Sequence, residues 1–135
     1  MTLPAPPALR FGPITMTDIV RYAGASGDFN PLHHDPAFAK AAGLPSVMAH
    51  GMLSAGLLGS FVSAWFGPGA VRRFKVRFTD RVWPGDVLVP SGHITRTFSA
   101  PDGTPRAEVV LELLRDGGAA VVTGTAEVAV ESFAT

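Results

Sequence analysis

The sequence predicts an α+β domain in which an antiparallel sheet wraps around one buried helix. Helix-forming segments fill its first half, and four segments in which apolar and polar residues alternate fill its second half. The chain has 135 residues, and globular domains commonly hold about 100–150 residues. We therefore expect residues 1–135 to form a single domain.

The first predicted helix lies near the N-terminus. Thr15 or Thr17 can cap a helix that runs toward Ala25 and carries one apolar stripe, made of Ile19, Val20 and Ala23. Gly27 and Pro31 break the pattern after it. A short helix is predicted after this break, with Pro36 at its start and a last residue at Ala42, just before a glycine.

Residues 51–65 predict the helix at the centre of the domain. They are apolar nearly all round, with Met52, Leu53, Leu57, Leu58, Phe61, Val62 and Trp65. A helix that is apolar on every face is usually buried on every face. In a chain this small, a sheet wrapped around the helix is the way to bury it.

Four strands are predicted after this helix. Residues 74–78, 107–113 and 122–130 show the two-residue period of half-buried strands. Residues 87–98 form a weaker candidate, because Pro90 and Gly92 suggest a bulge or an edge. Asp116-Gly117-Gly118 indicates a tight hairpin before the last strand. The expected inward-facing residues are Phe74, Val76, Phe78, Ala107, Val109, Leu111, Leu113, Val122, Ala126, Val128 and Val130.

The composition excludes several kinds of partner. Lys plus Arg and Asp plus Glu number 11 each, so no basic field attracts nucleic acid or anionic lipid. Residues 72–77 (RRFKVR) do cluster four cations, and here an exposed strand face is favoured over an anion patch for a phosphorylated carrier. The absence of cysteine excludes disulfides, thiolate zinc sites and cysteine nucleophiles. Only 16% of the residues are charged, which hints at a surface buried in a dimer.

Neither a secretion signal nor a membrane span is predicted. The N-terminal MTLPAPPALRFG lacks a basic stretch followed by a continuous apolar one. The most apolar run, residues 52–66, is interrupted by three serines and is shorter than the roughly 20 residues that a bilayer span needs. We expect a soluble cytoplasmic protein.

Asp28 and His33 are the candidate acid/base pair. On a regular helix, side chains five residues apart diverge, but Pro31 forbids a regular helix between them. A kinked turn lets the carboxylate and the imidazole converge, and such a pair can move protons near neutral pH. In the alternative, Asp28 caps a turn and His33 is a packing residue; their spacing alone favours this alternative.

The neighbouring polar residues have other expected roles. His34 follows His33 directly and is expected to be more exposed and not catalytic. Asn30 is expected to form or orient the turn. A metal site from His33, His34 and Asp35 is not favoured, because no familiar ligand spacing is present.

The segment AHGM, residues 49–52, opens the central helix. Helix N-termini present unpaired N–H groups and a partial positive charge. A ligand can approach the Gly51 amide closely, which makes it a candidate donor to a thioester carbonyl. A glycine needed only for close packing is an equally good interpretation. His50 is expected to be neutral at this positive helix end.

At these residues the sequence closely resembles the MaoC-like dehydratase family, which includes (R)-specific enoyl-CoA hydratases. The family signature Y-A-x-x-S-G-D-x-N-P-[LI]-H is matched over residues 22–33 and continues into DPAFAKAAGL and AHGML. RFTDRVWPGD, residues 77–86, looks like the family's strand leading into a P-G-D turn. The segment 22–52 is also similar to the β-type subunit of (3R)-hydroxyacyl-ACP dehydratases.

The resemblance implies a hot-dog fold, a dimer whose sheets join, and neither a metal nor an organic cofactor. It implies that Asp28 and His33 are catalytic, that the Gly51 amide polarises the thioester carbonyl, and that Asn30 supports the turn or a water at the substrate. One departure is that Gly59, followed by Ser60, stands near the place of a serine that helps to orient the aspartate in some hydratases.

The expected function is hydration of a trans-2-enoyl thioester of CoA or of acyl-carrier protein, or the reverse dehydration. A hot-dog thioesterase, a non-catalytic partner subunit of a heteromeric dehydratase and a purely structural domain are the alternatives. The SGDFNPLH segment argues against the thioesterase, and the Asp28, Asn30, His33 and Gly51 set argues against the other two.

Overall fold

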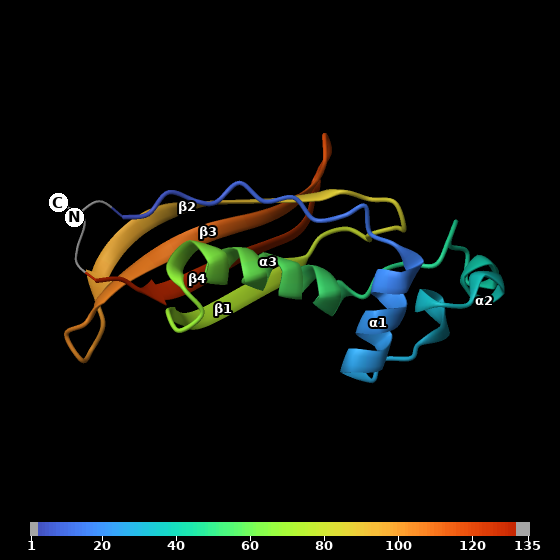
Figure 1. Cartoon of the computed structure of the whole chain (residues 1–135), viewed down its shortest axis with the longest axis horizontal. Helices are drawn as coiled ribbons and strands as arrows, with labels where there is room; N and C mark the ends of the chain where they lie inside the picture. The colour runs from blue at the N-terminus through green and yellow to red at the C-terminus, as the bar shows by residue number, and fades with distance from the viewer. Residues whose placement is uncertain (1–2, 132–135) are drawn as a thin grey trace.

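The computed structural model of the chain describes residues 3–131. One antiparallel sheet of four strands holds β1 (Val71–Phe78), β2 (Leu88–Ser99), β3 (Pro105–Arg115) and β4 (Ala120–Ala129). The long helix α3 (Gly51–Phe66) lies across one face of this sheet (Figure 1). The α+β prediction of a sheet around a central helix is therefore confirmed.

The remaining helical elements form a small lobe beyond the first turn of α3 (Figure 1). They are α1 (Met16–Ser26), the 3₁₀ turn η1 (Pro31–His33) and α2 (Pro36–Ala41). Helix α1 starts where the sequence predicts, because Thr15 and Asp18 form a capping box. Its buried stripe is narrower than expected: Ile19 and Ala23 are buried, whereas Val20 is 53% exposed.

The strand order in the sheet is β1-β4-β3-β2. Strand β4 is the last in the chain, yet it lies between β1 and β3 and pairs with both. The inward residues of β3, from Ala107 to Leu113, are at most 1% exposed, as their alternation predicts. Strand β2 is an edge strand, as Pro90 suggests; its irregularity, however, lies between Ile94 and Arg96.

One predicted feature of the core is wrong for a single chain. Helix α3 is not buried on every face, since Met52 is 59% exposed. On the neighbouring strand β1, Phe74 and Phe78 are 37% and 50% exposed. The physical reason is the position of β1: it forms a sheet edge, so no further strand within residues 3–131 lies beside it to cover its apolar side chains.

The loop between β1 and β2 fixes the start of α3. Arg115 binds this loop through the Asp86 carboxylate at 3.1 Å and the Asp80 carboxylate at 3.2 Å. The Ala49 N–H donates to the Val82 carbonyl in the same loop at 2.8 Å. The segment that leads into α3 is therefore held against the sheet side of the molecule.

The helices within residues 3–131 include none with the combined length and apolar character that crossing a membrane requires.

The capping box makes stability depend on pH. The backbone N–H of Thr15, and after it the Thr15 side chain, hold the pKa of the Asp18 carboxyl below its ordinary value of 3.8. A lowered folded pKa adds stability that is complete above the unfolded pKa and is lost as the pH falls through the folded value. We predict that Asp18→Ala lowers the thermal midpoint at pH 7, and that the difference from the wild type shrinks as the pH falls below 3.8, the ordinary value of the Asp18 pKa.

The measurement is a thermal unfolding series by circular dichroism from neutral to acid pH. Glu112→Gln is the matched control, because the exposed Glu112 side chain makes no hydrogen bond or ion pair with the described residues. A constant difference between Asp18→Ala and the wild type at every pH would contradict the prediction.

Candidate active site

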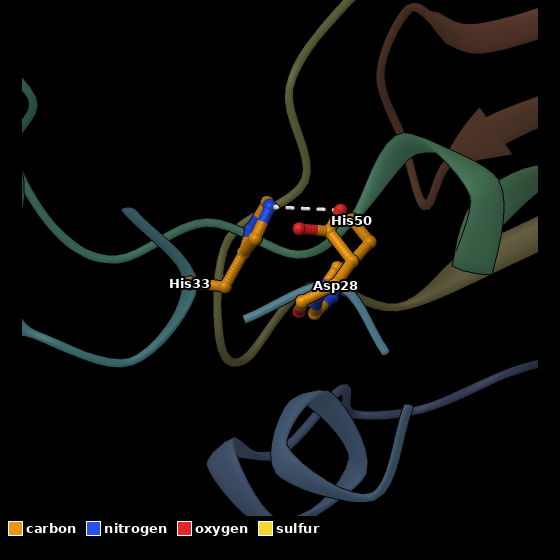
Figure 2. A group of neighbouring side chains, drawn as sticks. All are labelled: Asp28, His33 and His50. Carbon is orange, nitrogen blue, oxygen red and sulfur yellow. Dashed lines mark hydrogen bonds and ion pairs between the residues drawn. The ribbon is translucent and has the colours of Figure 1, made fainter. Parts of the chain in front are cut away.

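Asp28 and His33 converge at the turn that follows α1. Helix α1 ends at Gly27, whose φ of 75° is left-handed and suits glycine. The turn η1 then carries His33 back toward Asp28, so that His33 Nε2 lies 3.8 Å from Asp28 Oδ2 (Figure 2). This separation is too long for a direct hydrogen bond. The kinked turn predicted from Pro31 does bring the two groups to face one another.

The two partners differ in exposure and in hydrogen bonding. The His33 side chain is 8% exposed, whereas that of Asp28 is 52% exposed. His33 Nδ1 lies 2.7 Å from the Met48 carbonyl oxygen. A carbonyl only accepts, so Nδ1 carries the hydrogen and donates it. When the ring is neutral, Nε2 therefore presents a lone pair toward the Asp28 carboxylate.

Asn30 builds the turn, as predicted. Its side-chain oxygen accepts a hydrogen bond from the Leu32 N–H at 3.0 Å, and its own N–H donates to Asp28 Oδ1 at 3.2 Å. Contact of Asn30 with a substrate stays a prediction. His34 is exposed, as expected, and its Nε2 lies 3.2 Å from the Phe29 carbonyl oxygen; that it is not catalytic stays a prediction.

Gly51 is the first residue of α3, next to this pair. Within residues 3–131 its N–H has no hydrogen-bond acceptor, as is usual in the first turn of a helix. A Cβ at this position would lie 3.2 Å from the Phe78 ring. The donor interpretation and the close-packing interpretation of Gly51 both keep support. Its N–H is available to a ligand, and the Phe78 ring lies close to its Cα.

His50 joins the site although its role was not predicted. It is 2% exposed, and its ring stacks on that of His33 with 3.7 Å between centroids and 22° between planes. His50 Nε2 donates to the Asp28 carbonyl oxygen at 3.0 Å. The only sequence signal was its place beside Gly51, because the stacking depends on how two distant segments meet.

Ser60 does not take part in the site. It is exposed, and its hydroxyl donates to the Gly56 carbonyl of the same helix at 3.0 Å. The preceding Gly59 faces β1, where an added Cβ would lie 3.6 Å from the Phe74 ring. Neither residue orients Asp28 through a hydrogen bond, so the turn itself and His50 hold the aspartate in this chain.

A metal centre fits this geometry poorly. One donor atom from each of Asp28, His33 and His50 lies within 4.8 Å of the others. An imidazole binds a metal through a lone pair in its own ring plane, at about 2.0–2.1 Å. The two stacked rings are nearly parallel, so their lone pairs do not meet at one point unless a ring turns. The arrangement suits proton transfer better than chelation.

An apolar cavity of about 460 Å³ lies beside the site. Tyr22 belongs to its wall, and the edge of the same ring contacts His50 with 4.8 Å between centroids. Other lining residues are Phe11, Ile14, Ala25, Leu53 and Leu57, with Arg10, Asp18 and Arg21 also contributing. The site thus combines polar groups with a neighbouring space suited to an apolar group.

Comparison with known proteins places this fold and site among relatives. The (R)-specific enoyl-CoA hydratase of Aeromonas caviae is 32% identical over 121 residues, covering 88% of this chain and 86% of that protein. The solved structure of the A. caviae (R)-hydratase involved in PHA biosynthesis superposes with a TM-score of 0.81 at 29% identity, covering 96% and 97% of the two chains. The hot-dog fold is thereby confirmed.

Other relatives are much longer than the region they share with this chain. The peroxisomal hydratase-dehydrogenase-epimerase of Saccharomyces cerevisiae is 46% identical over 63 residues, which cover 47% of this chain and 7% of that protein. The 3-hydroxyacyl-thioester dehydratase X of Mycobacterium tuberculosis is 45% identical over 77 residues, covering 57% of this chain and 27% of that protein.

The family model described as a MaoC like domain matches residues 6–98. This range includes Asp28, His33, His50 and Gly51, so the whole candidate site lies within it. The chain belongs to the MaoC-like domain family.

Proposed function

We propose that this chain is a cytoplasmic hydro-lyase that adds water to trans-2-enoyl thioesters of CoA or acyl-carrier protein, giving (3R)-hydroxyacyl thioesters, and that also catalyses the reverse dehydration. One observation carries the proposal: His33 Nε2 faces the Asp28 carboxylate at 3.8 Å, and both groups contact His50, the residue directly before the free amide at the start of α3. The similarity to the A. caviae hydratase over nearly the full length of both chains supports it.

The mechanism follows from the proton positions. A water held between Asp28 and His33 gives one proton to this pair as its oxygen bonds to C3 of the enoyl group. The electrons of the C2=C3 bond move toward the thioester oxygen, where the Gly51 N–H and the positive end of α3 stabilise the developing charge. The pair then supplies a proton to C2 and returns to its starting state.

The roles of Asp28 and His33 can be tested by substitution. We expect Asp28→Asn and His33→Ala each to reduce kcat for crotonyl-CoA hydration by about 10²–10⁴-fold, because each removes a group that transfers protons. The measurement follows the ultraviolet absorbance of the conjugated enoyl thioester. His34→Ala is the matched control and is expected to keep turnover near the wild-type value.

Either catalytic variant that stays folded and keeps near-native hydration would contradict this assignment. Release of free thiol from an acyl-CoA, with no change in the enoyl signal, would point to the thioesterase alternative instead.

The Gly51 amide can be tested with two substitutions, one that removes the backbone N–H and one that keeps it. Proline suits the first position of a helix, and the preceding His50 has φ −63° and ψ 136°, which proline tolerates. Gly51→Pro removes the N–H, whereas Gly51→Ala adds a Cβ at the same place and keeps it. We expect Gly51→Pro to lower kcat by about 10²–10³-fold, and Gly51→Ala to lower it much less. Equal losses would show that packing against Phe78, and not the donor, matters.

We further propose that two copies pair along the β1 edge as a homodimer. This edge has no neighbouring strand in the described chain, and Phe74, Phe78 and Met52 leave an apolar surface beside it. Exposed apolar edges of this kind are usually covered by a partner. A second, different chain at this edge is the heteromeric alternative.

Phe74→Glu is expected to shift the purified protein from dimer to monomer, because a charge would be buried in the joined interface. Sedimentation velocity measures the change. Phe38→Glu is the control: Phe38 is 47% exposed on α2, away from β1. A monomeric wild type would contradict the homodimer and leave the second-chain alternative.

A further inference from the structure

We propose that His50 is a positioning residue that holds Asp28 and His33 in the facing arrangement the reaction needs. The inference rests on the proposed function for its link to turnover, but its geometric part stands without it. No atom of His50 needs to touch the substrate, because the residue acts through the two groups that do.

The His50 side chain contacts both members of the pair. Its ring edge reaches the backbone of Asp28, where Nε2 donates to the carbonyl oxygen at 3.0 Å. Its ring face covers the imidazole of His33 at 3.7 Å between centroids. The Tyr22 ring packs edge-to-face with the His50 ring at 4.8 Å between centroids, so His50 lies between Tyr22 of α1 and His33.

These contacts of His50 matter because few other contacts restrain the position of Asp28. The Asp28 side chain is 52% exposed, and its polar neighbours, Ser26 and Asn30, belong to the same turn. His50 belongs to the buried segment before α3, whose Ala49 is bonded to the Val82 carbonyl. The hydrogen bond from His50 therefore connects an exposed turn to a fixed part of the fold.

A role in packing alone does not explain an imidazole here. His50 Nδ1 is buried and has no hydrogen-bond partner among the described residues. A buried acceptor without a partner costs stability, and an apolar ring would fill the same space without that cost. Nor does the side chain cap α3, since His50 occupies the N-cap position without making a cap hydrogen bond. Among the described residues, the only hydrogen bond that the His50 ring nitrogens make is the one to the Asp28 carbonyl.

Two substitutions separate the two contacts. His50→Phe keeps a flat ring on His33 and removes the donor; His50→Gln keeps a donor and removes the ring. We expect His50→Phe to lower kcat by about 10- to 100-fold, because small misplacements of reacting groups are costly, with KM changed less than about threefold. His50→Gln should recover part of this loss. His93→Gln, on the exposed face of β2, is the matched control and should keep wild-type kinetics.

Thermal stability distinguishes positioning from a merely structural role, because a structural role predicts a lower thermal midpoint for His50→Phe. His50→Phe removes the unpartnered Nδ1 and the hydrogen bond to Asp28, whose effects on stability oppose each other, so its thermal midpoint should stay near that of the wild type. A kcat within twofold of the wild type in both variants would overturn the proposal. The proposal would also be overturned if the loss of kcat were fully explained by a loss of folded protein, or if KM rose while kcat stayed unchanged.

Crystal structures of the wild type and of His50→Phe test the geometry without any assay. Positioning predicts that the separation of Asp28 Oδ2 and His33 Nε2 lengthens or becomes variable in the variant compared with the wild type. An unchanged separation would overturn the role of His50 even if the variant were inactive. Should the wild type hydrate no enoyl thioester, the proposed function fails, and the crystallographic comparison still decides the positioning role.

Discussion

Three hydrogen bonds join the turn of residues 28–33 to the segment of residues 48–50, and the candidate site depends on them. The Met48 N–H donates to the Leu32 carbonyl, His33 Nδ1 donates to the Met48 carbonyl, and His50 Nε2 donates to the Asp28 carbonyl. Each bond uses a backbone carbonyl, so the contacts require the local chain path more than particular neighbouring side chains. They set the tautomers of both rings and leave His33 Nε2 facing the carboxylate.

Much of this arrangement could be predicted because it is encoded by residues that restrict the backbone. Pro31 and Gly27 forbid a continuous helix, which made convergence of Asp28 and His33 possible, although their spacing alone favoured a capping turn and a packing residue. His50 could not be assigned in this way, because its stack and its hydrogen bond arise only when two segments meet. Likewise, alternation in β1 identifies which side chains share a face, but it does not reveal that β1 is a sheet edge.

The apolar core and the polar site are built from different parts of the chain. The inward residues of β3 and β4 and the sheet-facing residues of α3 form the apolar core. The polar groups of the site come from a lobe and a loop beyond the start of α3 (Figure 1). The segment that leads into α3 carries a local cost to stability, the buried Nδ1 of His50 that has no partner among the described residues. Sites that break a local rule of stability are often those that function has shaped.

The position of β4 between β1 and β3 affects how the nascent chain folds. Strand β1 is synthesised before β2 and β3, whereas its strand partner β4 ends only at Ala129. Until then β1 has no neighbour in the sheet, and Phe74 and Phe78 stay open to other chains. Pairing across such a long stretch is also slow, since the loop must close before the contacts reward it. The nascent chain is therefore most prone to aggregation in the interval between the synthesis of β1 and that of β4.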